Sequence, residues 1–192
     1  MSCYAAFLRA INVGGHTVKM DALRRLFESF GFSEVETFIA SGNVIFNSTE
    51  QDAKTLESII ASGLKTALGF EVSAFIRTPL ELAEIAAYPA FPQPKLDAAT
   101  AFNIVFLASP LDDQAKKKLM ALTTNIDNFA VHAREVYWLC CKKQSESTFS
   151  NVLLDKTLGV KSTIRGISTI CKLADRWAPQ SSSVGPPHPF RG

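Results

Sequence analysis

The feature that most constrains the fold is an order of local patterns that occurs twice along the chain. Short β-rich runs alternate with amphipathic helical segments in the order β-α-β-β-α-β-α, first within residues 4–88 and again within residues 101–177. Sequence identity between the halves is slight, so what repeats is the order of elements. Because β-α-β-β-α-β is the ferredoxin-like order, we expect an α+β protein of two tandem ferredoxin-like repeats, each a four-stranded antiparallel sheet with helices on one face.

Turn and capping residues set the expected element boundaries. In the first half the expected strands are 4–11, 36–40, 44–46 and 71–77, with helices from Leu23 to Gly31, after the capping-box sequence Ser48-Thr-Glu-Gln51, and from Pro79 to about Tyr88. In the second half the expected strands are 101–107, 129–132, 136–141 and 161–165, with helices from Ser109-Pro110 to Leu122, over 146–158 and over 169–177.

These elements divide the chain into four parts. Residues 1–88 form the first repeat with an added helix, 89–100 a Pro-rich connector, 101–177 the second repeat with an added helix, and 178–192 a disordered tail rich in Pro and Ser. Residues 104–107 and 138–141 are apolar without alternation, which is typical of strands buried on both faces. Packing of the two open sheet faces against each other, cover by a partner, or strand exchange between the halves would each satisfy that pattern.

Composition places the chain among ordinary globular proteins, with 47% hydrophobic and 20% charged residues. The longest charge-free apolar run, residues 98–111, is far shorter than the roughly 20 residues that span a bilayer, so we expect no membrane segment. No targeting segment is visible, and the four cysteines form no C-x-x-C pair, which favours reduced thiols in the cytoplasm. No His, Asp or Glu group has metal-ligand spacing, so no metal site is expected.

Two polar, Gly-containing loops in the first repeat form the best candidate site. Residues 12–15, Asn-Val-Gly-Gly, follow the first strand, and residues 41–43, Ser-Gly-Asn, join the next two strands as a hairpin turn. A right-handed crossover brings the end of the first strand, the hairpin turn and a helix N-terminus to one edge of the sheet. The free N–H groups there favour an anion. Turn chemistry alone also explains the glycines, and neither a Walker A loop nor G-x-G-x-x-G is present.

The candidate ligand-binding residues are at this edge. They are Arg9, Asn12, Gly14, Gly15, Ser41 and Asn43. Arg9 interrupts an otherwise apolar strand, so it either lines a cleft or forms a structural ion pair. His16 follows the Gly pair, but no nucleophile motif accompanies it, and the sequence leaves catalysis, cofactors and oligomeric state open.

The motifs of this region resemble a known bacterial family. Residues 7–15, Phe-Leu-Arg-Ala-Ile-Asn-Val-Gly-Gly, and residues 41–46, Ser-Gly-Asn-Val-Ile-Phe, are similar to the N-terminal signature of domain-of-unknown-function family 1697. Residues 158–160 and 163–169 are similar to its second recurrent stretch. The chain departs from the family at Ala10, where Gly is usual, and at Gly166, Ile167 and Ser168, where Asn, Trp and Asn are usual. The resemblance implies a two-part α+β fold and no established activity.

Three functional hypotheses follow. The leading one is binding of an anionic small molecule or nucleotide at the loop edge. The second is nucleic-acid binding, which the ferredoxin-like sheet and a mildly basic second half favour. Residues 89–192 contain 13 Lys and Arg and 8 Asp and Glu. The RRM signature is absent, however. The third is a structural or interaction protein without a ligand.

Overall fold

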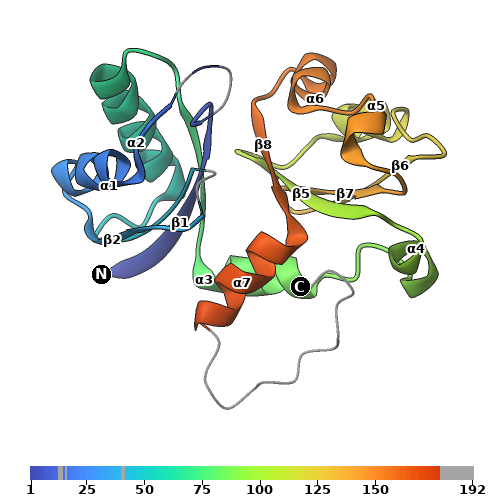
Figure 1. The fold of residues 1–192 in the computed structure, drawn as a ribbon, viewed down its shortest axis with the longest axis horizontal. Coiled ribbons are helices and arrows are strands. Elements are labelled where there is room, and N and C mark those ends of the chain that lie inside the picture. The colour runs from blue at the N-terminus through green and yellow to red at the C-terminus, as the bar shows by residue number, and fades with distance from the viewer. Residues whose placement is uncertain (13–14, 16, 40–41, 178–192) are drawn as a thin grey trace. The chain divides into compact units, whose positions relative to one another are not determined.

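The computed structural model describes residues 1–12, 15, 17–39 and 42–177 (Figure 1). The chain divides into two compact units, Met1–Pro79 and Leu80–Gly192. Each unit contains one four-stranded antiparallel sheet and packed helices, so the α+β class expected from the sequence is confirmed. The tail expected at 178–192 lies outside the described residues.

The first unit is built around a sheet with strand order β2-β3-β1-β4. Its elements are β1 Ser2–Arg9, α1 Met20–Ser29, β2 Ser33–Thr37, β3 Asn43–Ser48, α2 Ala53–Leu68 and β4 Ser73–Arg77. Every pair of neighbouring strands is antiparallel, and Phe7 of β1 lies opposite Asn43 of β3 and Phe75 of β4. The alternation of side chains along β1 therefore defines an inner and an outer face of the sheet.

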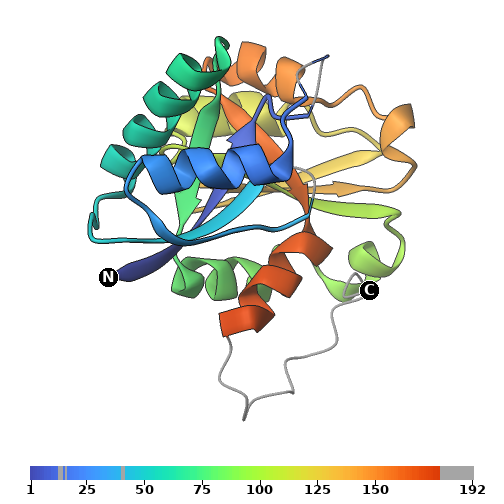
Figure 2. The same cartoon turned by 60° about the vertical axis from the view of Figure 1, so that its left-hand side comes forward.

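The core of the first unit lies between the inner face of the sheet and helices α1 and α2, which run side by side over it (Figure 2). Leu23 and Phe27 of α1 have no exposed surface, and neither has Ile60 of α2. The spacing of these residues gives each helix one apolar face. Phe27, Phe32 and Phe46 form an aromatic cluster with ring centroids 4.5–5.8 Å apart. Each fully buried side chain of this size contributes about 1.5–3 kcal/mol through removal from water.

The second unit has the equivalent strand order β6-β7-β5-β8. Its elements are α3 Pro79–Ala87, α4 Gln93–Asp97, β5 Ala101–Leu107, α5 Asp113–Met120, β6 Asp127–His132, β7 Glu135–Cys140, the 3₁₀ turn η1 Gln144–Glu146, α6 Asn151–Leu158, β8 Ser162–Gly166 and α7 Ile167–Trp177. Helix α3 begins at the last residue of the first unit. Each sheet contains strands of its own half only, so the described strands are not exchanged between halves.

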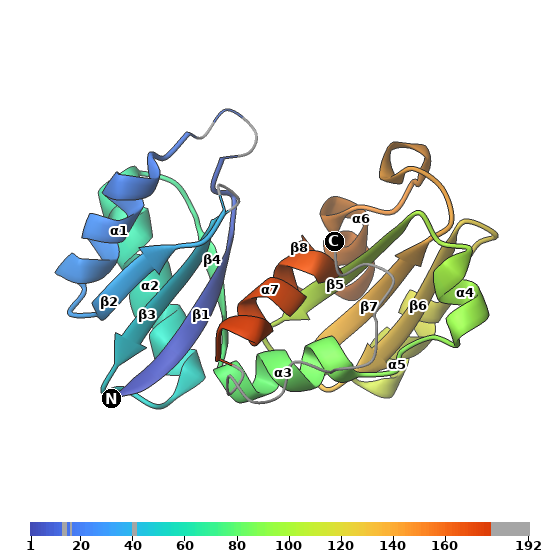
Figure 3. The same cartoon turned by 60° about the horizontal axis from the view of Figure 1, so that its bottom comes forward.

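Both faces of the second sheet are covered within the second unit. Val105 and Trp138 pack into a core with Leu119 of α5. On the opposite face the Tyr137 hydroxyl donates to the Ile85 carbonyl of α3 at 3.4 Å, and the Phe102 ring lies 5.8 Å from that of Phe91. Figure 3 shows α3 and α7 together beside this sheet. The non-alternating apolar pattern of β5 and β7 thus reflects helices on one face and the segment from α3 to Phe91 on the other.

Several boundaries differ from the sequence expectation. Element order groups helix α3 with the first repeat, whereas the division into compact units falls after Pro79, its first residue, and the short helix α4 lies within residues 89–100. The N-cap of α2 is Asp52, because Ser48 is still the last residue of β3 and its hydroxyl accepts from Glu50 N. The N-cap of α5 is likewise Asp112, later than Ser109-Pro110. At the start of each helix, both the expected and the observed residue have short polar side chains that can cap a helix. The surrounding tertiary structure therefore determines which of them is the N-cap.

Candidate functional site

The two candidate loops both leave the sheet through backbone conformations that L-residues seldom adopt. After β1, Ala10 has φ 71° and Asn12 has φ 56°. In the β2–β3 hairpin, Ile39 has φ 58° and Gly42 has φ 73°. Positive φ is strained for alanine and more so for a β-branched residue such as isoleucine, which is also half exposed here. Three of the five non-glycine residues with positive φ in the described part of the chain therefore lie in or beside these two loops, and the other two are Glu34 and Ala133.

Main-chain contacts hold the two loops together. The Leu8 N–H donates to the Gly42 carbonyl at 2.8 Å. A Cβ atom at Gly42 would lie 3.2 Å from the Ile11 Cβ and 3.3 Å from the Leu8 Cβ, closer than most side-chain contacts. Glycine is therefore favoured at position 42 for two reasons. Its φ is positive, and the hairpin lies so close to the end of β1 that a Cβ atom would be crowded.

The two asparagines of the candidate set support the loops. The Asn12 Oδ1 accepts from the Val18 N–H at 2.8 Å and so closes the loop that precedes α1. The Asn43 side chain is only 1% exposed, and its Nδ2 donates to the Phe38 carbonyl at 3.0 Å. The Phe38 N–H in turn donates to the Asn43 carbonyl, so Asn43 holds the hairpin loop through both its side chain and its main chain.

Arg9 and Gly15 are the other members of the candidate set that the structure describes, since Gly14 and Ser41 lie outside the described residues. Arg9 is half-buried at the C-terminal end of β1, where it pairs with Ser73 of β4. Gly15 is exposed with φ 87°. Helix α1 begins soon afterwards, and its N-cap residue Lys19 makes no side-chain capping hydrogen bond. Arg9 supplies positive charge to this edge, and α1 supplies uncapped N–H groups nearby in the sequence.

Two arginines lie on the corresponding edge strands of the two sheets, the buried Arg77 on β4 and the half-buried Arg165 on β8, and sequence reasoning missed them. Arg77 of β4 lies opposite Ala5 of β1, and Arg165 of β8 lies opposite Ile104 of β5. In each, Nη1 donates to the carbonyl of the preceding residue, at 2.7 and 2.8 Å. Burial lowers the pKa of Arg165 to about 10, which leaves it charged at neutral pH. The signal in the sequence was an arginine that directly follows an isoleucine near the end of each of these short β-rich runs.

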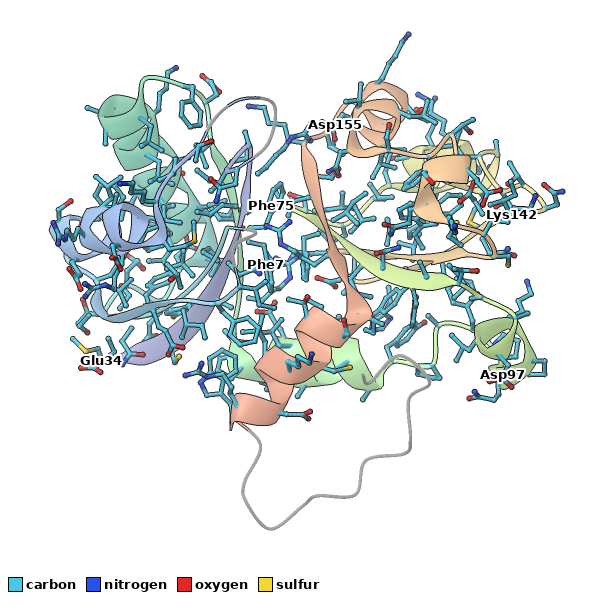
Figure 4. All side chains as sticks on the ribbon, viewed as in Figure 1. Phe7, Glu34, Phe75, Asp97, Lys142 and Asp155 are labelled. Atoms are coloured by element: carbon cyan, nitrogen blue, oxygen red, sulfur yellow. The ribbon has the colours of Figure 1, made fainter. Side chains whose placement is uncertain are left out.

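The outer face of the first sheet carries the aromatic pair Phe7 and Phe75, which project from adjacent strands (Figure 4). Binding of single-stranded nucleic acid by such a sheet requires exposed rings on which bases can stack. Neither ring belongs to the core that the inner face of the sheet forms with helices α1 and α2.

Three further observations concern metal ligation, membrane crossing and the cysteines of the described residues. Within these ranges no group of three or more His, Cys, Asp and Glu side chains is arranged to hold a metal ion. Across the same part of the chain, no helix has both the length and the apolar character needed to cross a membrane. The four cysteines are free thiols.

Comparison with known proteins places the chain in a class without an assigned activity. A solved structure, that of the conserved bacterial protein SP0830 from Streptococcus pneumoniae, is similar at a TM-score of 0.74 and 22% identity, covering 93% of this chain and 99% of that one. At this identity the likeness concerns the fold. No curated protein matches the sequence. The family model described as Protein of unknown function (DUF1697) matches residues 1–137, and the chain belongs to that family, as the sequence motifs indicated.

Proposed function

We propose that this protein binds a small anionic molecule, such as a phosphate ester or nucleotide, at the edge formed by residues 12–15 and 41–43. The observation that carries the proposal is the junction of the two loops at Gly42, where each loop also contains strained non-glycine residues. Strain of this kind persists only where the surrounding structure enforces it, and it is concentrated at ligand sites.

The candidate residues then have different roles. Arg9 provides charge and directional donors to the anion, Gly15 allows the backbone to approach it closely, and Gly42 lets the hairpin lie against the end of β1. Asn12 and Asn43 act by holding the loops, given their hydrogen bonds to Val18 and Phe38. Gly14 and Ser41 complete the loops in sequence.

We also infer that each unit is a ferredoxin-like repeat. The support is the β-α-β-β-α-β order within both units, together with matching strand orders in which the first and third strands are central neighbours. A cytoplasmic location is in keeping with the free thiols, because disulfides are rare in that compartment.

Isothermal titration of the full chain with inorganic phosphate and with adenosine monophosphate tests the binding proposal. Replacing Arg9 with Gln should weaken binding about tenfold or more, because a hydrogen bond to a charged group contributes about 1.5–3 kcal/mol. The matched control is Arg24→Gln on α1, where an exposed arginine pairs with Glu28 of the same helix. Equal affinities of the Arg9 variant and the unaltered protein would contradict the proposal, as would absence of binding by the unaltered protein.

A further inference from the structure

A buried side-chain donor without a partner lies in the middle of the second sheet. Asn103 is on the central strand β5, opposite Trp138 of β7 and Gly166 of β8. It is 4% exposed, and its Nδ2 is the one buried side-chain nitrogen or oxygen that makes no hydrogen bond within the described part of the chain. Buried polar groups are nearly always paired, so an orphaned one requires an explanation.

Asn103 lines a pocket of about 390 Å³ that lies wholly within the second unit. Three segments form it: residues 100–103 around the start of β5, residues 143 and 144 after β7, and residues 166–168 where β8 passes into α7. The volume is within the range of small-molecule sites. Asn103 therefore has room beside it for a ligand with an acceptor atom.

The charges around the pocket favour an anion. Lys143 lines it and has no ion pair with any described residue, and the lining contains no Asp or Glu. Its neighbour Lys142, labelled in Figure 4, instead pairs with Glu146 at 4.0 Å and is not part of the lining. Of these two adjacent lysines, only Lys143 therefore lines the pocket.

The pocket also receives the N-terminus of a helix. Helix α7 begins at Ile167, directly after the last residue of β8, and extends over 11 residues. The first N–H groups of a helix have no partner within it, and its dipole favours negative charge at this end. Its first turn contains no acidic residue. Ile167 and Ser168 both line the pocket.

We propose that this pocket is a second binding site. It binds the oxyanion group of a small molecule, and this group is a phosphate monoester or a carboxylate. Asn103 Nδ2 donates one hydrogen bond to the oxyanion, the first turn of α7 donates from its backbone N–H groups, and Lys143 supplies the charge. Phe102 and Ile167 provide apolar lining for the remainder of the ligand. This site is in the second unit and is independent of the loop edge in the first.

Nuclear magnetic resonance titration of the full chain with inorganic phosphate, and separately with acetate, tests the site. At least one of the anions should shift the Asn103 side-chain amide and the backbone amides of Ile167 and Ser168 with a common dissociation constant. Tighter phosphate binding would assign a phosphate ester, and tighter acetate binding a carboxylate. Unmoved signals at saturating concentrations of both anions would overturn the proposal.

Variants separate a binding role from a structural one. Lys143→Ala should weaken the titration about threefold or more, as expected for one exposed charge, whereas Lys142→Ala should leave it within about twofold. Equal effects of the two would overturn the assignment of Lys143. Asn103→Leu should abolish the shifts while the urea midpoint of unfolding stays the same or rises, because an unpaired donor is removed. Retained binding in this variant, or a lower midpoint, would contradict the role given to Asn103.

Discussion

At the scale of single residues, Ala10 has a backbone conformation that suits glycine better than alanine. It adopts φ 71°, a region that costs an L-residue about 1–2 kcal/mol and glycine almost nothing. We expect Ala10→Gly to stabilise the protein by about 1 kcal/mol in urea unfolding. Ala67→Gly on an exposed position of α2 is the control and should destabilise by a similar amount. A loss of stability in both variants would contradict the strain assigned to Ala10.

Asn43 has a structural role that can be measured separately from binding. Its side chain is buried and donates to the Phe38 carbonyl, so Asn43→Ala leaves that acceptor without its side-chain donor. We expect a loss of about 1–3 kcal/mol of unfolding free energy. Asn47→Ala, four residues along on the same face of β3, should cost clearly less because Asn47 is only half-buried. Equal losses would show that the Phe38 bond contributes little.

At the scale of elements, the start of α2 depends on a capping carboxylate. The Asp52 side chain accepts from the Thr55 N–H at 2.8 Å and from its hydroxyl at 2.7 Å, and these bonds lower the pKa of Asp52. A lowered folded-state pKa contributes stability above the unfolded value of about 4, and this stability is lost as the pH falls through the folded value. Asp52→Ala should therefore lower the Tm at pH 7, with a smaller difference from the unaltered protein at about pH 3. A difference that stays constant with pH would contradict the carboxylate cap.

The elements also show where sequence reasoning succeeds. Periodicity and turn residues are local signals. They predict both repeats, the antiparallel hairpins and the meeting of the two loops. The N-cap of α2 does not, because Ser48 and Asp52 are equally suited to capping and the end of β3 decides between them. Asn103 stands in a run that otherwise predicts a buried strand. Its orphaned amide becomes visible only when residues 143 and 166–168 are brought beside it.

At the scale of the whole molecule, the unit boundary predicts which fragments fold. Helix α3 contributes the buried residues Leu82 and Ile85 to the second unit, and Glu81 forms a half-buried salt bridge with Arg134 at 2.6 Å. Each lost apolar side chain costs about 1.5–3 kcal/mol against a typical domain stability of about 5–15 kcal/mol. We expect a fragment of residues 80–177 to be clearly more stable in urea than one of residues 89–177. Equal stabilities would place the boundary after α3, as element order alone suggests.

The proposed function depends most on the claim that the two loops of the first unit form one anion-binding edge. The most direct test is a two-dimensional ¹⁵N nuclear magnetic resonance titration of the full chain with adenosine monophosphate, following the backbone amides of Gly15 and Gly42. We expect both signals to shift with the same dissociation constant, and we expect Arg9→Gln to weaken that constant while Arg24→Gln does not. Saturating nucleotide that leaves both glycine signals in place, or shifts them equally in the Arg9 variant, would contradict an anion site at this edge.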